Sequence, residues 1–148
     1  MRALPNLRAL LLSIALLTLW SCGPSFDEAR DAWQRAQPAA YIFEYQRSCF
    51  CPGSGAWWRV TVRHDSVVDV QLLASPTADG HLEYSPRMSH PTLSQLFDGI
   101  AAFSLGPHTW TKVQYDRQWH FPSHASGDVT DRTHGRWSFS VRNFHLLQ

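Results

Sequence analysis

Two cysteines separated by a single residue are the clearest candidates for chemistry in this chain. Cys49 and Cys51 flank Phe50 in the stretch SCFCPG, and turn-forming residues occupy positions 52–55. Residues two apart on a strand point to the same face with Cα atoms about 6.6 Å apart. That distance is close to the upper limit of about 6.8 Å for disulfides, and a kink at the neighbouring turn shortens it. The spacing therefore predicts a structural disulfide between Cys49 and Cys51.

Two other chemistries fit the same pair of thiols. A C-x-C motif supplies two ligands where a closed zinc site takes four, and no histidine lies within ten residues of either cysteine. Redox enzymes more often place C-x-x-C at a helix N-terminus, where the helix dipole lowers the thiol pKa. Metal-binding thiols and a redox pair therefore stay as alternatives, while we expect neither a metal nor a cofactor.

A second group of polar and aromatic residues lies between positions 115 and 128. His120 and His124 are four residues apart, but Pro122 between them argues against the helix that would turn both imidazoles to one side. We therefore interpret these histidines as loop and surface residues. Asp116 is expected to accept backbone N–H groups and to hold its loop. The segment is the predicted binding loop, with the candidate residues Tyr115, Asp116, Trp119, His120, Pro122 and Asp128.

The first residues of the chain are typical of an exported lipoprotein. Arg2 and Arg8 form a short basic region, and positions 9–19 are almost wholly apolar. The segment LWSC at 19–22 resembles a lipobox, in which the cysteine is acylated and becomes the new N-terminus. We predict a signal peptide over 1–21 and a lipid anchor on Cys22. No aspartate follows Cys22, which favours the outer membrane, with the domain facing the periplasm.

Composition and missing motifs exclude several classes of function. The chain has 13 basic and 12 acidic side chains, and Arg2 and Arg8 precede the predicted mature start. The nearly neutral remainder lacks the basic surface that holds nucleic acid phosphates. The sequence contains no G-x-S-x-G, H-E-x-x-H, P-loop or dinucleotide-binding motif. We therefore predict no catalytic residues and no nucleic acid partner.

Residues 22–148 contain a series of helix and strand patterns, and we predict that they form one domain. Two capping boxes, at Ser25–Glu28 and Thr92–Gln95, mark the starts of two amphipathic helices. The first helix is expected over 26–37, and the second is expected to stop near Gly106. Period-two alternation predicts strands from Tyr41, over 56–64, 67–73 and 108–116, and around 124–129 and 137–141, with a brief strand near 82–84.

This order segregates helices from strands instead of alternating them in parallel units. The first three strands are expected to form an antiparallel meander with one buried face. The predicted fold class is therefore α+β, with an antiparallel sheet of five to six strands and two helices packed on one face.

The order of several motifs resembles domain-of-unknown-function family 6174, a family of bacterial exported proteins and lipoproteins. The resemblance covers about residues 30–144, and the matching positions are Phe43, Tyr45, Cys49, Cys51, Val60, Val62, Val68, Thr92, Leu96, Phe97, Tyr115, Asp116, Trp119, Phe121, Pro122 and Asp128. Two departures stand out. His120 replaces a glycine of the family pattern, and Asp131 is the clear remnant of an acidic cluster, so a cation site there is not expected. The family has no assigned activity, so the resemblance implies none for this chain.

The residues together predict a lipid-anchored cell-envelope protein with a non-catalytic binding or interaction role. Its partner would be an envelope protein or a small molecule, met by the sheet or by the 115–128 loop. The alternative is a thiol–disulfide or metal-handling envelope protein that uses Cys49 and Cys51.

Overall fold

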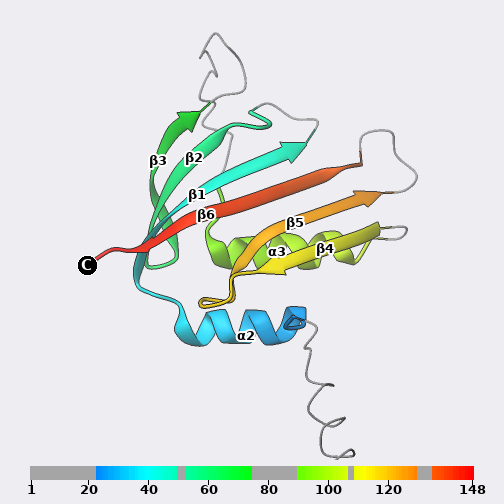
Figure 1. Ribbon diagram of the computed structural model, residues 1–148, viewed down its shortest axis with the longest axis horizontal. Helices are drawn as coiled ribbons and strands as arrows, with labels where there is room; N and C mark the ends of the chain where they lie inside the picture. Colours follow the sequence, from blue (N-terminus) through cyan, green and yellow to red (C-terminus); the bar gives the residue numbers. More distant parts are fainter. Residues whose placement is uncertain (1–22, 50–52, 75–89, 107–108, 130–134) are drawn as a thin grey trace, which may run out of the picture.

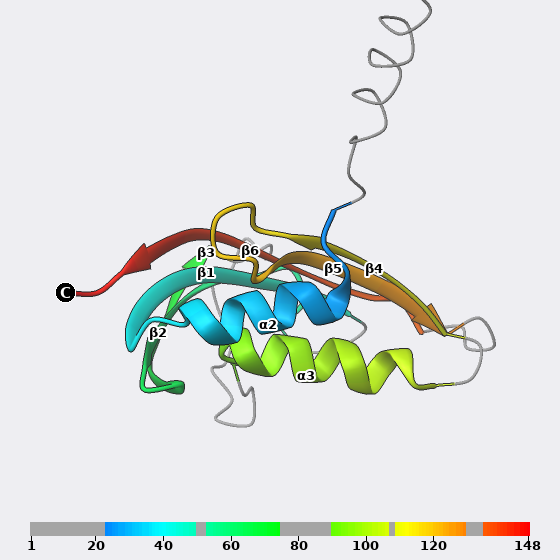
Figure 2. The same ribbon diagram turned by 90° about the horizontal axis from the view of Figure 1, so that it is seen from below.

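Six antiparallel strands form one sheet, and two helices lie side by side across one of its faces (Figures 1 and 2). The computed structural model describes residues 23–49, 53–74, 90–106, 109–129 and 135–148. The elements in chain order are α2 (Phe26–Ala36), β1 (Ala40–Cys49), β2 (Trp57–Arg63), β3 (Ser66–Ala74), α3 (Leu93–Ser104), β4 (Thr109–Tyr115), β5 (Pro122–Val129) and β6 (Trp137–Leu146). The strand order β3-β2-β1-β6-β5-β4 confirms the predicted α+β class and the antiparallel meander of the first three strands.

Both helices begin at the predicted capping boxes. The Ser25 hydroxyl accepts the Glu28 backbone N–H at 3.3 Å, and a Glu28 carboxylate oxygen accepts the Ser25 N–H at 2.8 Å. Thr92 and Gln95 repeat this exchange at the start of α3. The first helix ends one residue before the predicted position, at Ala36. Gln37 leaves the helical conformation because a proline disfavours helical backbone angles in the residue before it.

Alternation along the strands buries one face of the sheet beneath the helices. Tyr41, Phe43 and Tyr45 of β1 lie beside Val62, Val60 and Trp58 of β2, and all six side chains are buried. Trp33 of α2 and Leu96, Phe97 and Ile100 of α3 close the core from the other side. The prediction of a single buried sheet face is therefore confirmed at the centre of the sheet.

Two strands differ from the prediction. β3 is an edge strand without a fully buried residue, and Val68 on it is 54% exposed. β6 extends to Leu146, well past the alternation that marked it at 137–141. Asn143 has a φ of 52°, and the pairing with β1 shifts there. This bulge adds a residue, so Phe144 rather than Asn143 reaches the core. The predicted strand near 82–84 lies outside the described residues.

The turn between β4 and β5 is held by the aspartate that the sequence singled out. Asp116 Oδ1 accepts the backbone N–H groups of Gln118 and Trp119 at 2.9 and 2.7 Å, which confirms its predicted structural role. The His120 N–H then donates to the Asp116 carbonyl at 3.1 Å. His120 has a φ of 62°, in the left-handed region that glycine adopts without steric cost. This backbone conformation explains why the family that the sequence resembles has glycine at this position.

Replacing His120 with glycine should stabilise the fold. The left-handed conformation costs a non-glycine residue about 1–2 kcal/mol, and the greater chain entropy of glycine in the unfolded state offsets part of that. We expect His120→Gly to raise the free energy of unfolding by about 0.5–1 kcal/mol, measured by denaturant titration. The matched control is Gln118→Gly in the same turn, which should lower it. A His120→Gly protein no more stable than the parent chain would contradict this account of the turn.

Candidate functional site

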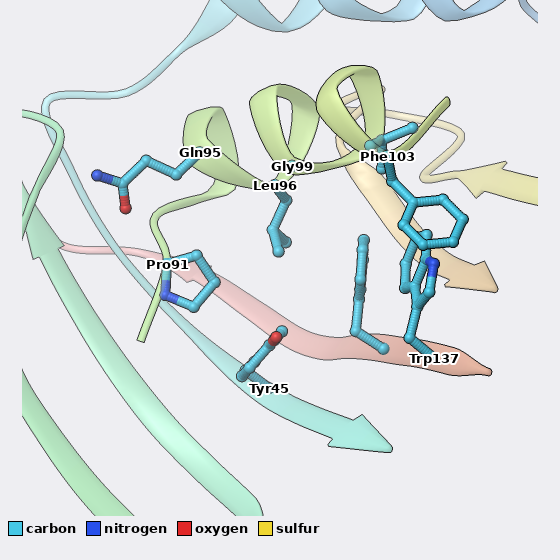
Figure 3. Close-up of a pocket in the computed structure, with 9 residues that line it drawn as sticks. Tyr45, Pro91, Gln95, Leu96, Gly99, Phe103 and Trp137 are labelled. Atoms are coloured by element: carbon cyan, nitrogen blue, oxygen red, sulfur yellow. The ribbon is translucent and has the colours of Figure 1, made fainter. Parts of the chain in front are cut away.

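An apolar pocket with a volume of about 280 Å³ opens between α3 and the sheet (Figure 3). None of its nine lining residues is charged, and they come from β1, from the segment that enters α3, from α3 itself and from β6. They are Tyr45, Pro91, Gln95, Leu96, Gly99, Ile100, Phe103, Trp137 and Phe139. The pocket therefore brings together four segments that are far apart in the sequence.

The position of α3 sets the width of this pocket. The Tyr41 hydroxyl accepts the backbone N–H of Leu93 at 3.3 Å, which fixes the first turn of the helix over the sheet. Leu96 and Ile100 then point down into the core, and both are almost completely buried. Gly99 lies between them along the helix and also lines the pocket. A Cβ at this glycine would meet no atom within 4 Å, so the missing side chain leaves the wall of the pocket open.

Aromatic rings from α3, β1 and β6 form much of the rest of the lining. Phe103 meets Trp137 edge to face with ring centroids 4.7 Å apart. Trp137 and Phe139 lie nearly parallel at 6.1 Å, and Phe139 is tilted against Tyr45 at the same distance. Rings in such contact hold one another in place. The wall is therefore a fixed apolar surface that flat molecules can stack against.

The hydroxyl of Tyr45 is the main polar group of the pocket. The side chain is only 7% exposed, and Figure 3 shows its oxygen directed toward α3. The Tyr45 hydroxyl makes no hydrogen bond to another residue in the described part of the chain. Burial raises the pKa of Tyr45 to about 12, although the nearby Arg47 guanidinium opposes the shift. At neutral pH this hydroxyl is protonated and is available as a donor.

A second donor lies in the aromatic wall. The indole Nε1 of Trp137 is buried and has no hydrogen-bond acceptor within the described ranges. Gln95 contributes a side-chain amide, and its oxygen already accepts the Thr92 N–H of the capping box. No carboxylate, imidazole or thiol is among the lining residues. The pocket can thus hold and orient an apolar molecule, with the Tyr45 hydroxyl as a hydrogen-bond donor.

Five of the six predicted loop residues gather around the β4–β5 turn, where they support the fold. Tyr115 stacks on Phe97, and burial raises the pKa of its hydroxyl. Trp119 packs on Phe144, and Pro122 is fully buried. Asp128 lies toward the other end of β5 and pairs with Arg136 at 3.1 Å. Tyr115, Asp116 and His120 also line a shallow hollow of about 490 Å³ that includes Gly23 and Pro24.

The histidines of this segment do not lie together as a pair of ligands. His120 is in the turn, whereas His124 faces away from the helices and its Nδ1 lies 3.1 Å from the Ser140 hydroxyl of β6. In the described residues no group of three histidine, cysteine, aspartate or glutamate side chains is arranged to hold a metal ion.

Cys49 is the last residue of β1 and lies directly opposite Trp137 of β6 in the strand register. Its backbone N–H donates to the Ser54 hydroxyl at 3.1 Å, across the turn that leads into β2. Cys51 and Cys22 lie outside the described residues. The disulfide and the lipid anchor therefore stay predictions.

The pocket was not predicted from the sequence. Tyr45 was predicted as a strand residue and as one of the matches to the family, and Gln95 as part of a capping box, but neither was predicted to line a pocket. One local signal was available, because a glycine inside an otherwise regular helix often has a packing or functional reason. Gly99 is such a glycine. The donors on β1 and β6 come together only through strand pairing, which local patterns do not specify.

Within the described residues no helix has both the length and the apolar character needed to cross a membrane.

Comparison with known proteins places the chain in a family. No curated protein and no solved structure matches the chain. A family model described as "Family of unknown function (DUF6174)" matches residues 25–145, which include both helices and nearly all of the sheet. The chain therefore belongs to this family of unknown function, as the order of its motifs predicted.

Proposed function

We propose that this chain is a lipid-anchored protein of the cell envelope whose domain binds a small apolar molecule in the pocket between α3 and the sheet. The observation that carries the proposal is the Tyr45 side chain, which is only 7% exposed in an apolar pocket and whose hydroxyl has no hydrogen-bond partner among the described residues. Buried polar side chains in folded proteins almost always have a partner. A bound molecule with an acceptor atom supplies one.

A second lining residue has a buried donor without an acceptor. Leaving such a donor unsatisfied costs about 1–3 kcal/mol, and among the described residues the indole N–H of Trp137 is in this state. Sites for small molecules are typically concave, mostly apolar and equipped with a few polar groups that orient the ligand. The pocket beside α3 has this character, with aromatic walls, the Tyr45 hydroxyl and the buried indole N–H of Trp137.

A binding role is also consistent with the functional groups that are missing from the lining of the pocket. Its lining residues include no carboxylate, imidazole or thiol, and the protein would hold its ligand unchanged. The pocket replaces the 115–128 loop as the favoured binding site, because the side chains of that loop are engaged in holding the turn.

The proposed envelope location rests on the sequence of the leader. Gly23 and Pro24 lie against the β4–β5 turn, in the hollow that Asp116 and His120 also line. An acylated Cys22 would hold this end of the domain close to the membrane surface, and two or more acyl chains make such an anchor stable. We favour the outer membrane, with the domain in the periplasm.

The cysteine pair supports a structural role within the same proposal. Cys49 ends β1 beside the turn at 53–55, and a bond to Cys51 would fix that strand end opposite Trp137 of the pocket. An exported location favours the oxidised form. Thiol–disulfide exchange or metal handling is the alternative function, and it requires both thiols to be free in the native protein.

Filling the pocket at Gly99 should abolish binding. Benzophenone is a neutral, apolar photolabel that reacts with neighbouring C–H bonds, and we expect it to label peptides of α3 and β6 in the full chain. Gly99→Leu places a side chain in the open wall and should reduce this labelling about tenfold. Gly99→Ala adds a methyl group alone and should raise helix stability by about 0.5–1 kcal/mol while labelling stays within about twofold of the parent level.

Peptide mass spectrometry after ultraviolet irradiation measures both effects, and circular dichroism verifies that each variant is folded. Labelling that is spread over the surface, or that is equal in the parent and Gly99→Leu proteins, would overturn the proposed binding site.

The anchor and the disulfide can be tested in one preparation. Mass spectrometry of the protein from the membrane fraction should find an acylated N-terminal Cys22. Alkylation before reduction should leave Cys49 and Cys51 unmodified, and alkylation after reduction should modify both. A soluble protein that starts at another residue would contradict the anchor. Ready alkylation of both thiols in protein from an oxidising compartment would favour thiol or metal chemistry instead.

A further inference from the structure

We propose that the ligand of the α3 pocket is an uncharged, flat ring compound with an acceptor oxygen, such as a ketone, and that the Tyr45 hydroxyl recognises this oxygen. The inference rests on the proposed function and specifies its ligand class. Three properties of the pocket support this ligand class: the absence of charge from its lining, the kind of its hydrogen-bonding groups and the shape of its walls.

The absence of charge from the lining favours a neutral ligand. A charged group moved into an apolar site without a partner loses several kcal/mol of hydration, and none of the lining side chains can compensate it. Arg47 is the cation closest to Tyr45 along β1. It does not line the pocket, and it has an interaction partner of its own. An anionic ligand would therefore find no cation among the lining residues to pair with.

The hydrogen-bonding groups favour an acceptor. Tyr45 offers a protonated hydroxyl, and Trp137 offers an indole N–H, which can only donate. Neither donor has an acceptor in the part of the chain that the structure describes. A carbonyl oxygen accepts and has no proton of its own, so it can satisfy the Tyr45 hydroxyl without leaving a new donor unpaired.

The walls favour a flat and small molecule. Tyr45, Phe103, Trp137 and Phe139 supply four aromatic rings, and stacked or edge-on ring contacts are more favourable than their buried area alone predicts. Gly99 presents backbone without a side chain on the helix side. The volume of about 280 Å³ lies just below the roughly 300 Å³ at which sites for drug-sized ligands begin. Two or three joined rings suit such a space better than a long acyl chain.

A matched set of competitors tests each property against benzophenone labelling of the full chain. 9-Fluorenone is flat, neutral and carries one carbonyl oxygen. Fluorene has the same ring system without the oxygen, and 9-fluorenecarboxylate adds a negative charge. We expect 9-fluorenone to suppress labelling of α3 and β6 at concentrations about fivefold to tenfold lower than fluorene, which is the effect of one hydrogen bond. The carboxylate should be the weakest competitor.

Removing one hydroxyl should erase the preference for the ketone. Tyr45→Phe keeps the shape of the wall, so fluorene should compete as before while 9-fluorenone weakens to the same level. Tyr115→Phe is the matched control, because it removes a partly buried hydroxyl on β4 outside the pocket. That variant should keep the full difference between 9-fluorenone and fluorene. Thermal unfolding of both variants establishes that they are folded.

The possible failures are distinguishable. Equal competition by 9-fluorenone and fluorene in the parent chain, with labelling still blocked by Gly99→Leu, would overturn recognition by Tyr45 and leave the binding site standing. Strongest competition by the carboxylate would overturn the neutral class. Labelling that does not depend on Gly99 would overturn the proposed function itself and the ligand class with it.

Discussion

The hydroxyl of Tyr41 accepts a hydrogen bond from the backbone N–H of Leu93, and the helix that starts there depends on it. Tyr41 is fully buried on the inner face of β1, and burial raises the pKa of its hydroxyl far above the usual range. Its ring meets Trp33 of α2 edge to face and is tilted against Phe144 of β6. One side chain thereby ties both helices and the closing strand to the centre of the sheet. Without its oxygen, the first turn of α3 would keep a buried N–H without an acceptor, which is costly.

Two tyrosines on the same face of β1 show how the fold produces a site. Tyr41 and Tyr45 are both buried, and burial raises the pKa of both. The hydroxyl of Tyr41 is used by the fold, because Leu93 donates to it. The hydroxyl of Tyr45 faces the pocket, where the described chain offers it no partner. The bond at Tyr41 fixes the helix whose open wall, at Gly99, leaves Tyr45 accessible to a small molecule.

The elements that carry this arrangement could be predicted from local patterns, and the site could not. Capping boxes at Ser25 and Thr92 marked the helices because they satisfy backbone N–H groups within four residues. The alternation of Tyr41, Phe43 and Tyr45 marked the buried face. The extension of β6 to Phe144 depends on a bulge at Asn143 that alternation does not reveal. The pocket depends on strand pairing and on the position of α3 over the sheet, which bring together Tyr45 and Trp137, 92 positions apart in the chain.

A crystal structure of the full chain grown with 9-fluorenone tests the central claim most directly, because it locates the ligand and the Tyr45 hydroxyl together. The account predicts the rings between Gly99 and the Trp137–Phe139 wall, with the carbonyl oxygen about 2.7–2.8 Å from the Tyr45 hydroxyl. A ligand bound at another surface would contradict it. So would a structure in which α3 packs directly on β6 and the Tyr45 hydroxyl donates to a group of the protein.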